Sequence, residues 1–180
     1  MTLKCNYSSI ATSSLVFLIL VMFTIFGISG CKVTYSLTGA SISPAVKTIS
    51  IQYFQNRASL VQPALSQDMT NALIDKCKAQ TNLSLITGAG DVNFEGEITE
   101  YATVPLTVSG DARAAMNRFT ISVKVKFTNI VEPGLSYDQV FSRYEDYDSN
   151  LDLSQVEQQL SKKITALIIE DIFNKAFANW

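Results

Sequence analysis

The clearest pattern in the sequence is a strict alternation of apolar and polar residues from Phe119 to Thr128. Its apolar positions are Phe119, Ile121, Val123, Val125 and Phe127. Successive side chains of a β-strand point to opposite faces of its sheet, so this period of two predicts a long antiparallel strand. One face should lie in the core, and the other, which carries Lys124 and Lys126, should be exposed to solvent.

Three further segments alternate less cleanly, and each predicts another strand: Thr48–Phe54, Val92–Tyr101 and Tyr137–Tyr144. In the first, Ile49, Ile51 and Tyr53 share one face. The second places Val92, Phe94, Gly96 and Ile98 on its apolar face. Because the alternation of the third is the weakest, we expect that strand at an edge of the sheet.

Charged residues on the polar faces of two predicted strands match each other in sign. Glu95 and Glu97 can lie opposite Lys124 and Lys126 on the neighbouring strand. Such cross-strand pairs contribute roughly 0.2–1 kcal/mol each, which gives both rows a structural use. With Glu100, the carboxylates also allow a metal or acid–base site, and a solvent-facing row is the simpler interpretation.

Two segments have the period of amphipathic helices. Pro63 is expected in the first turn of one, and Thr81-Asn82 ends it. Asp152 and Gln155 form a capping box at the start of the other. The apolar stripe of the first is Leu65, Met69, Ala72, Leu73 and Cys77, and that of the second is Val156, Leu160, Ile164, Leu167 and Ile168, extended by Ile172, Phe173, Phe177 and Trp180.

The remaining segments read as connections. We expect a long connection over Pro105–Asn117, a turn at Glu132-Pro133-Gly134 and an acidic loop over Glu145–Asp148. The order of elements is therefore β-α-β-β-β-α. This order predicts an α+β fold, a two-layer sandwich with two helices packed on one face of a four-stranded mixed sheet and the other face open.

The start of the chain has the layout of a secretory signal that ends in a lipidation site. A polar stretch with Lys4 precedes the apolar run Leu15–Ile28, and Ser29-Gly30 then leads into Cys31. This pattern looks like the lipobox of bacterial lipoproteins, in which the cysteine carries fatty acyl chains such as palmitate.

The lipobox predicts three parts: a signal peptide removed at 1–30, a lipidated tether over 31–46 and a single domain over 47–180. A retained anchor is one alternative, although the 14 apolar residues are short against the roughly 20 that a spanning helix needs. The other is a plain signal with a chance cysteine.

Composition argues against several classes of function. The chain has no His, which removes the usual catalytic triads and zinc sites, so we expect no enzyme, cofactor or metal. Beyond residue 30 there are 13 basic residues (the 14 of the chain less Lys4) against 16 acidic ones, a net charge of −3 that does not suit a nucleic-acid binder. With Cys31 lipidated, Cys77 is either a buried small hydrophobe or a reactive thiol.

Five segments in order along the chain carry a resemblance to a known family: Lys47–Phe54, Phe94–Ile98, Asn117–Asn129, Phe141–Tyr144 and Glu170–Lys175. Through them the chain from Ser43 to Trp180 resembles the LptE family of lipopolysaccharide-assembly lipoproteins, in the form found in Bacteroidota. The family fold, two helices on a four-stranded sheet, agrees with the order derived above.

The resemblance implies a role at the outer membrane. Members plug the lumen of a large β-barrel, LptD, and the pair inserts lipopolysaccharide or lipooligosaccharide into the outer leaflet. We therefore expect an outer-membrane protein anchored by acylated Cys31, on the periplasmic side and in the barrel lumen. A free periplasmic lipid- or glycan-binding lipoprotein and a hydrolase are the alternatives, and the absence of His counts against the hydrolase.

Basic residues are the candidates for contact with glycolipid or barrel. The family is described as binding lipopolysaccharide through such residues, but none of those positions carries over to this sequence. Phosphates on lipid A suit Arg and Lys, which makes Arg113, Arg118, Lys124 and Lys126 candidate contacts. The other interpretation of these four is a solvated rim with cross-strand ion pairs.

Overall fold

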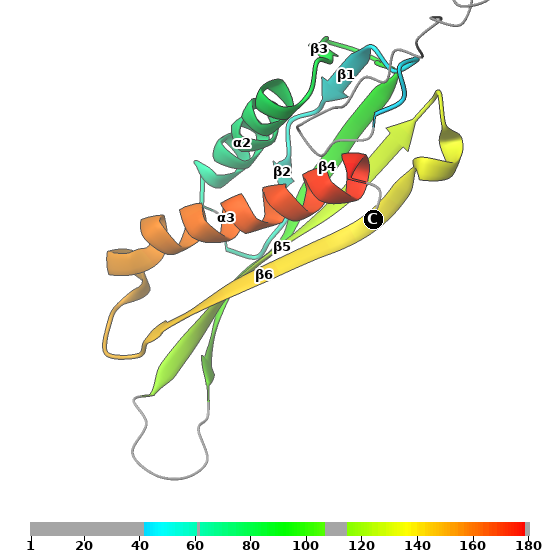
Figure 1. The fold of residues 1–180 in the computed structure, drawn as a ribbon. Helices are drawn as coiled ribbons and strands as arrows, with labels where there is room; N and C mark the ends of the chain where they lie inside the picture. Colours follow the sequence, from blue (N-terminus) through cyan, green and yellow to red (C-terminus); the bar gives the residue numbers. More distant parts are fainter. Residues whose placement is uncertain (1–41, 61, 107–114, 179–180) are drawn as a thin grey trace, which may run out of the picture. The chain divides into compact units, whose positions relative to one another are not determined.

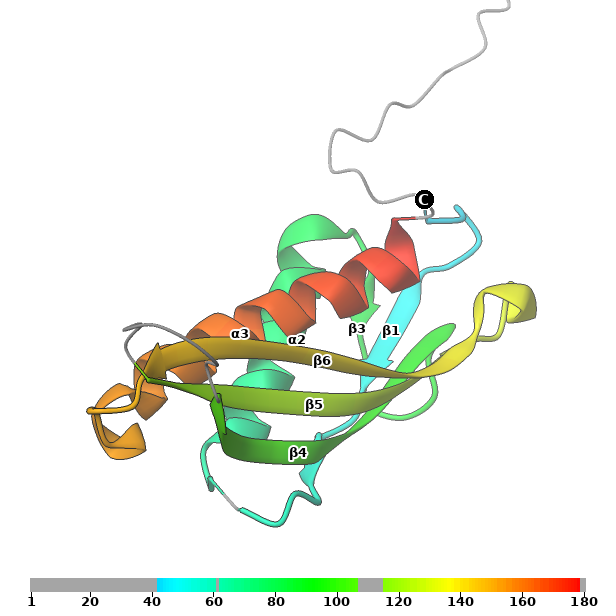
Figure 2. The same ribbon diagram turned by 90° about the horizontal axis from the view of Figure 1, so that it is seen from below.

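Two helices cover one face of a mixed sheet in the computed structural model, which describes residues 42–60, 62–106 and 115–178 (Figure 1; Figure 2). The strands are β1 (Thr48–Ile51), β2 (Gln55–Asn56), β3 (Ser84–Leu85), β4 (Val92–Leu106), β5 (Met116–Asn129) and β6 (Tyr137–Asp148). The helices are α2 (Leu65–Gln80) and α3 (Leu153–Phe177), and a 3-10 turn, η1 (Pro133–Leu135), precedes β6. The predicted α+β class and the β-α-β-β-β-α order are confirmed, with the short β2 and β3 added.

The strand order of the sheet is β3-β1-β4-β5-β6, and β2 pairs with β4 beyond the end of β1. β1 runs parallel to β3 and β4, whereas β4, β5 and β6 form an antiparallel meander. β6 is at an edge, as its weak alternation predicted. Within the described ranges, neither helix is long and apolar enough to cross a membrane.

The meander is longer than the sequence predicted. Pro105 pairs with Asn117, so the predicted connection over Pro105–Asn117 is wrong at both of its ends. Proline is tolerated there because β2 ends at Asn56, which leaves β4 without a described neighbour on that side. The predicted acidic loop Glu145–Asp148 is also wrong, since β5 continues to Met116 and its backbone finds partners in β6.

β5 forms the middle of the core. Its odd-numbered side chains from Phe119 to Phe127 face the helices, and each is at most 1% exposed, as predicted. The end of α3 closes this core with aromatic rings, since the Phe127 ring centroid lies 4.8 Å from that of Phe94 and 5.9 Å from that of Phe177. Edge and tilted packing of this kind adds roughly 0.5–1.5 kcal/mol per pair beyond the area buried.

The described parts of the helices follow their predicted stripes with one exception, and the predicted stripe residue Trp180 lies outside the described ranges. Leu65, Met69, Leu73 and Cys77 of α2 are buried, and Thr81 caps that helix. In α3 the Gln155 side chain accepts the backbone N–H of Asp152 at 3.1 Å, which confirms the predicted capping box. Leu167 is the exception, because it is 40% exposed while Ile169 is buried in its place.

The first strand segment is interrupted, and this changes which aromatic ring is buried. Ile51 pairs with Phe94 but Gln55 pairs with Glu97, so the segment from β1 to β2 has one more residue than β4 between the two pairs. The prediction that Tyr53 shares the face of Ile49 is therefore wrong: Ile49 is 1% exposed, Tyr53 is 52% exposed, and Phe54 is fully buried instead.

A bulge in β4 has a similar effect. Ile98 pairs with Val123 and Glu100 with Ser122, which leaves Thr99 as the additional residue. The shift turns Glu100 to the face without helices and Tyr101 toward α3. Tyr101 is 3% exposed, its hydroxyl donates to Glu157, and burial raises its pKa.

One carboxylate joins the start of β1 to the start of β4. Asp91 Oδ2 accepts the N–H groups of Lys47 (2.8 Å) and Thr48 (2.9 Å) and the Thr48 hydroxyl (2.8 Å). These hydrogen bonds, that from Lys47 foremost, lower the pKa of Asp91. Just before this clamp, Val46 is buried and Ile42 packs against the core.

Substitution on the two faces of β5 should separate core from surface. Val123→Asp buries a carboxylate without a partner at a fully buried position, so we expect loss of several kcal/mol and an unfolded domain. Thr120→Asp, on the other face, should cost less than about 1 kcal/mol. Urea melts of both variants measure the difference, and equal destabilisation would contradict the facing assigned here.

Gly96 should be replaceable only when Phe54 is made smaller. An added Cβ at Gly96 would lie 2.6 Å from Phe54 Cζ, so the fully buried Phe54 ring would have to shift. We expect Gly96→Ala to cost about 1–3 kcal/mol. In a double-mutant cycle with Phe54→Leu, the cost of the alanine should fall, whereas additive costs would show that the two residues do not interfere.

Candidate functional site

The face of the sheet that carries no helix, called the open face below, is mostly polar, although Val104 (57% exposed) and Val140 (52% exposed) also lie on it. Cross-strand partners share a face, so the even-numbered positions of β5 and their partners on β4 and β6 all point there. Its central side chains are Glu95, Glu97, Glu100, Arg118, Thr120, Ser122, Lys124, Lys126, Asp138, Val140, Ser142, Tyr144 and Asp146.

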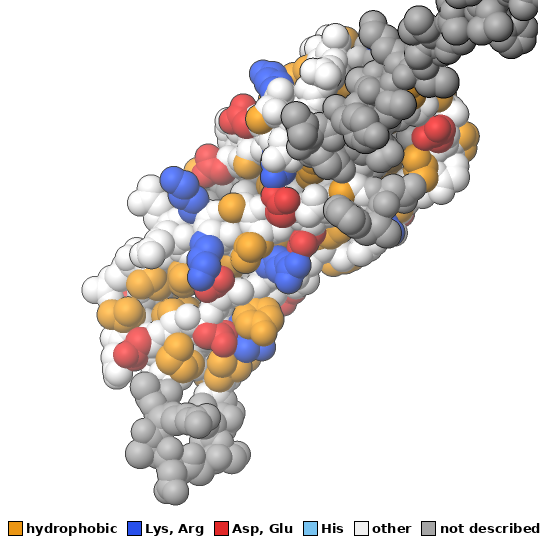
Figure 3. Space-filling view, viewed as in Figure 1, with side chains coloured by type: hydrophobic (Ala, Val, Ile, Leu, Met, Phe, Trp, Pro, Cys, Tyr) orange, Lys and Arg blue, Asp and Glu red, His pale blue; other side chains and the backbone are white. Residues whose placement is uncertain are grey.

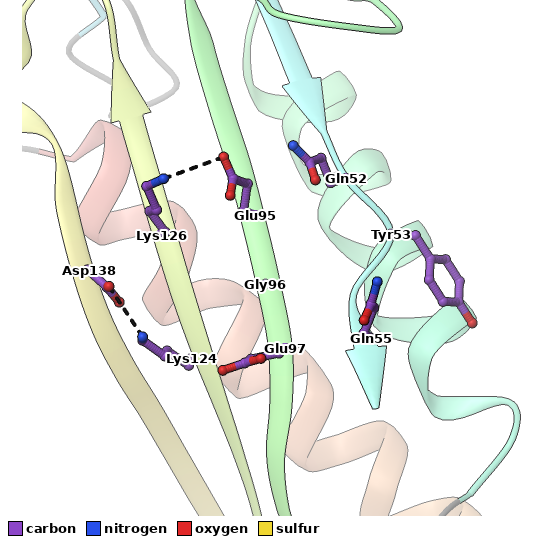
Figure 4. Close-up of a pocket in the computed structure, with 9 residues that line it drawn as sticks. All are labelled: Gln52, Tyr53, Gln55, Glu95, Gly96, Glu97, Lys124, Lys126 and Asp138. Carbon is purple, nitrogen blue, oxygen red and sulfur yellow. Dashed lines mark ion pairs between the residues drawn. The ribbon is translucent and has the colours of Figure 1, made fainter. Parts of the chain in front are cut away.

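At one end of the open face lies a shallow hollow of about 290 Å³ (Figure 4). Lys126 Nζ lies 3.7 Å from Glu95 Oε1, and Lys124 Nζ lies 3.3 Å from Asp138 Oδ2. The predicted opposition of the two charge rows is confirmed by the pairs Glu95–Lys126 and Glu97–Lys124, although Lys124 forms its ion pair with β6. Gln52, Tyr53 and Gln55 line the other side of the hollow.

The ion pairs in the hollow are open to solvent. The two lysine side chains are 45% and 56% exposed, and their carboxylate partners are 51% and 44% exposed. Pairs in such surroundings are screened by water and salt and are worth about 0–1 kcal/mol. The lysines can therefore exchange one anionic partner for another at little cost.

At the other end of the open face, Arg118 is held from two sides. Its Nε and Nη2 donate to the two carboxylate oxygens of Asp146 at 2.8 and 2.9 Å, and its guanidinium carbon lies 3.6 Å from the centroid of the Tyr144 ring. The hydrogen bonds to Asp146 raise the pKa of Arg118, and those from Arg118 lower the pKa of Asp146. Such a bidentate, stacked arginine is far less free to change partner than the lysines.

Ser122 lies between these two groups. Its Oγ donates to Glu100 Oε2 at 2.6 Å, and it lies 2.9 Å from Ser142 Oγ, which can donate to it in turn. Glu100 reaches this position only because of the bulge at Thr99. Several donors and acceptors of the open face are thus paired with each other, and the described residues contain no group of three or more metal-ligating side chains.

Sequence reasoning found the cations of this face and the partner of Lys126, Glu95, but not the partners on β6. Asp138, Tyr144 and Asp146 were missed, because the register of β6 against β5 decides which of them meets Arg118 or Lys124. The predicted residues Cys31 and Arg113 lie outside the described ranges. Cys77 is 2% exposed and burial raises its pKa to about 12, which supports the interpretation as a small buried hydrophobe.

The opposite side of the domain shows how charge is arranged over the helices (Figure 3). Basic and acidic side chains are interspersed there, and some join separate elements: Lys76 of α2 pairs with Glu170 of α3, and Lys163 of α3 pairs with Glu145 of β6 at 2.8 Å. These partly exposed pairs connect the helices to each other and to the sheet, and each contributes about 0–1 kcal/mol at most.

Solved structures share this fold at low sequence identity. A hypothetical protein, CT253, from Chlamydia trachomatis has a TM-score of 0.50 at 11% identity, over 75% of this chain and 100% of that one. A putative neuraminyllactose-binding hemagglutinin homolog from Helicobacter pylori has a TM-score of 0.50 at 8% identity, over 79% and 89%. A minor lipoprotein from Acinetobacter baumannii reaches 0.48 at 12% identity, over 72% and 91%.

Sequence comparison gives a more specific result. Curated proteins give no match. The family model described as LptE, lipopolysaccharide-assembly, matches residues 46–176, which span β1 through nearly all of α3. The chain therefore belongs to the LptE family of lipopolysaccharide-assembly lipoproteins, whose members are not enzymes.

Proposed function

We propose that this protein is the lipoprotein partner of an LptD-type outer-membrane β-barrel, in the form found in Bacteroidota. It plugs and supports the barrel while lipopolysaccharide or lipooligosaccharide is inserted into the outer leaflet. Membership of the family over residues 46–176 supports the role in assembly. The observation that supports the role as a plug is the contrast between the two faces of the sheet.

A plug needs a polar surface, because the interior of a large outer-membrane barrel is itself polar. The apolar face of the sheet is fully covered by α2 and α3, while the open face offers hydroxyls, amides and exposed ion pairs. Such a surface can form hydrogen bonds with a polar wall without burying an unpaired charge.

Within the open face, the hollow at Lys124 and Lys126 is the better candidate for contact with glycolipid phosphate. These lysines can leave their exposed carboxylates for a phosphate, which carries more charge than either carboxylate. Arg118 is engaged by Asp146 and Tyr144, so its proposed part is to contact the barrel or to hold β5 against β6. Arg113, close to Arg118 in sequence, stays a candidate for either contact.

The proposed anchor is acylated Cys31, which follows removal of residues 1–30. The tether predicted over 31–46 is proposed to end before Ile42, because Ile42 and Val46 pack against the core. Each methylene buried in the membrane adds about 0.8 kcal/mol, and one chain alone holds only marginally. Several acyl chains on one cysteine therefore give a stable attachment. The alternative, a free periplasmic lipid- or glycan-binding lipoprotein, shares this anchor but has no barrel partner.

Charge reversal on the open face should weaken the proposed contacts. We expect Lys124→Glu with Lys126→Glu to reduce binding of labelled lipopolysaccharide about tenfold at low salt, and the deficit should shrink at high salt as charges are screened. Arg113→Glu with Arg118→Glu should reduce co-purification with the barrel. Lipopolysaccharide binding and co-purification with the barrel are both measured for each double variant, at low and at high salt.

The matched control is Lys78→Glu with Lys162→Glu, at exposed positions of α2 and α3, which changes the net charge by the same amount. It should bind glycolipid and barrel as the unaltered chain does. Open-face variants that behave like this control would move the site off the open face. Binding of lipopolysaccharide without any co-purified barrel would favour the free lipoprotein.

Replacement of the predicted lipidation site tests the anchor separately. Cys31→Ser should leave an uncut or soluble precursor, because the serine hydroxyl does not take the place of the acylated thiol. Mass spectrometry of the amino terminus checks this directly. An unaltered protein that retains an intact peptide across Gly30 and Cys31 would contradict the proposed anchor.

A further inference from the structure

The outer edge of β6 is long and unprotected by the usual devices. Its twelve residues keep one register with β5, from Tyr137 opposite Phe127 to Asp148 opposite Met116, without a bulge, proline or glycine. Proteins commonly blunt an edge with proline, lysine or a bulge, since a bare edge invites another strand. In the described part of the chain, only the ladder with β5 hydrogen-bonds the backbone of residues 137–147.

The hydrogen bonds at the ends of β5 show which backbone groups of β6 point outward. Asn129 donates its N–H to Ser136 Oγ, and Ala115 accepts from Ser149 at 3.0 Å, so odd-numbered positions of β5 point toward β6. Ile130 instead donates to Asp91 on the β4 side at 2.9 Å. Because these directions alternate along a strand, the outward N–H and C=O groups of β6 belong to Asp138, Val140, Ser142, Tyr144 and Asp146.

Charged side chains of β6 form ion pairs with other residues of the domain. On the open face, Asp138 and Asp146 pair with lysine and arginine of β5. On the helix side, Arg143 Nε lies 2.6 Å from Asp171 Oδ2, and Glu145 pairs with Lys163. These charges are neutralised by neighbours inside the domain and do not screen the edge from an incoming strand.

A groove runs beside the same edge. It measures about 480 Å³ and lies between residues 139–143 of β6 and the last turns of α3, where Asp171, Asn174 and Lys175 form its wall. Figure 2 shows α3 and β6, the two elements that line it, running side by side. A strand added to β6 would place every second side chain in this groove, next to Phe141.

We propose that the β6 edge and this groove bind an extended segment of another polypeptide as an added strand. The segment is uncharged and alternating, because the charges along the edge already have partners and a further buried charge would have none. A second copy of β6 fits less well, since antiparallel pairing centred on Ser142 sets Asp138 opposite Asp146. The inference goes beyond the proposed function and does not depend on the open-face contacts.

A designed hairpin tests the edge directly. The probe is a disulfide-closed hairpin of alternating Thr and Val whose outer strand is N-methylated, so that only one edge can pair. With the full chain in detergent, we expect the probe to slow amide hydrogen exchange at Val140, Ser142 and Tyr144. Exchange at Gln139, Phe141 and Arg143, which already bond to β5, should change little. A hairpin methylated on both edges should not bind.

Val140→Pro removes one outward N–H without touching the ladder to β5, and we expect it to weaken binding of the hairpin about tenfold. Val140→Thr retains the N–H and should bind like the unaltered chain. Equal binding of the two hairpins, or protection of odd and even residues alike, would overturn the proposal. The proposal would also be overturned if the even-numbered amides of β6 were protected from exchange without the hairpin and this protection rose with protein concentration. That result would show that a second copy of the chain binds the edge.

Discussion

The pairing of β5 with a neighbour on each side, over nearly its whole length, is the constraint on which the domain depends. It fixes the odd-numbered side chains from Phe119 to Phe127 under the helices and the even-numbered ones on the open face. A slip by one residue on β5 would exchange the two sets and bury lysines where phenylalanines lie. The core, the hollow and the direction of the β6 edge all follow from this one register.

Much of the fold could be predicted from periodicity because its most regular elements bury one face and expose the other to solvent. β5, β4 up to the bulge and the stripe of α2 were of this kind. Prediction failed where the register changes: neither the additional residue that buries Phe54 in place of Tyr53 nor the bulge at Thr99 alters the local alternation enough to be seen. The acidic segment Glu145–Asp148 was misread because its strand structure comes from pairing with β5, a long-range demand that overrides local preference.

The candidate site was only partly open to the same reasoning. A cation can be seen in a sequence, and its face can be inferred from alternation, but its ion partner depends on the register between strands. Arg118 and Lys124 looked equivalent in the sequence. One is stacked and held by two hydrogen bonds, and the other is in a loose, exposed pair. Arg118 and Lys124 should therefore differ in how readily they bind another anion, and the difference comes from their partners on β6.

The clamp at Asp91 has a mechanical consequence. Residues before Val46 join the domain where one carboxylate gathers hydrogen bonds from Lys47 and Thr48. Tension applied through the amino-terminal side passes the core contacts of Ile42 and Val46 and then meets this carboxylate, whose three hydrogen bonds share the load at the start of β1. β1 lies parallel to β4 and is only four residues long. The clamp thus reinforces the attachment of β1, whose own pairing with β3 and β4 is short.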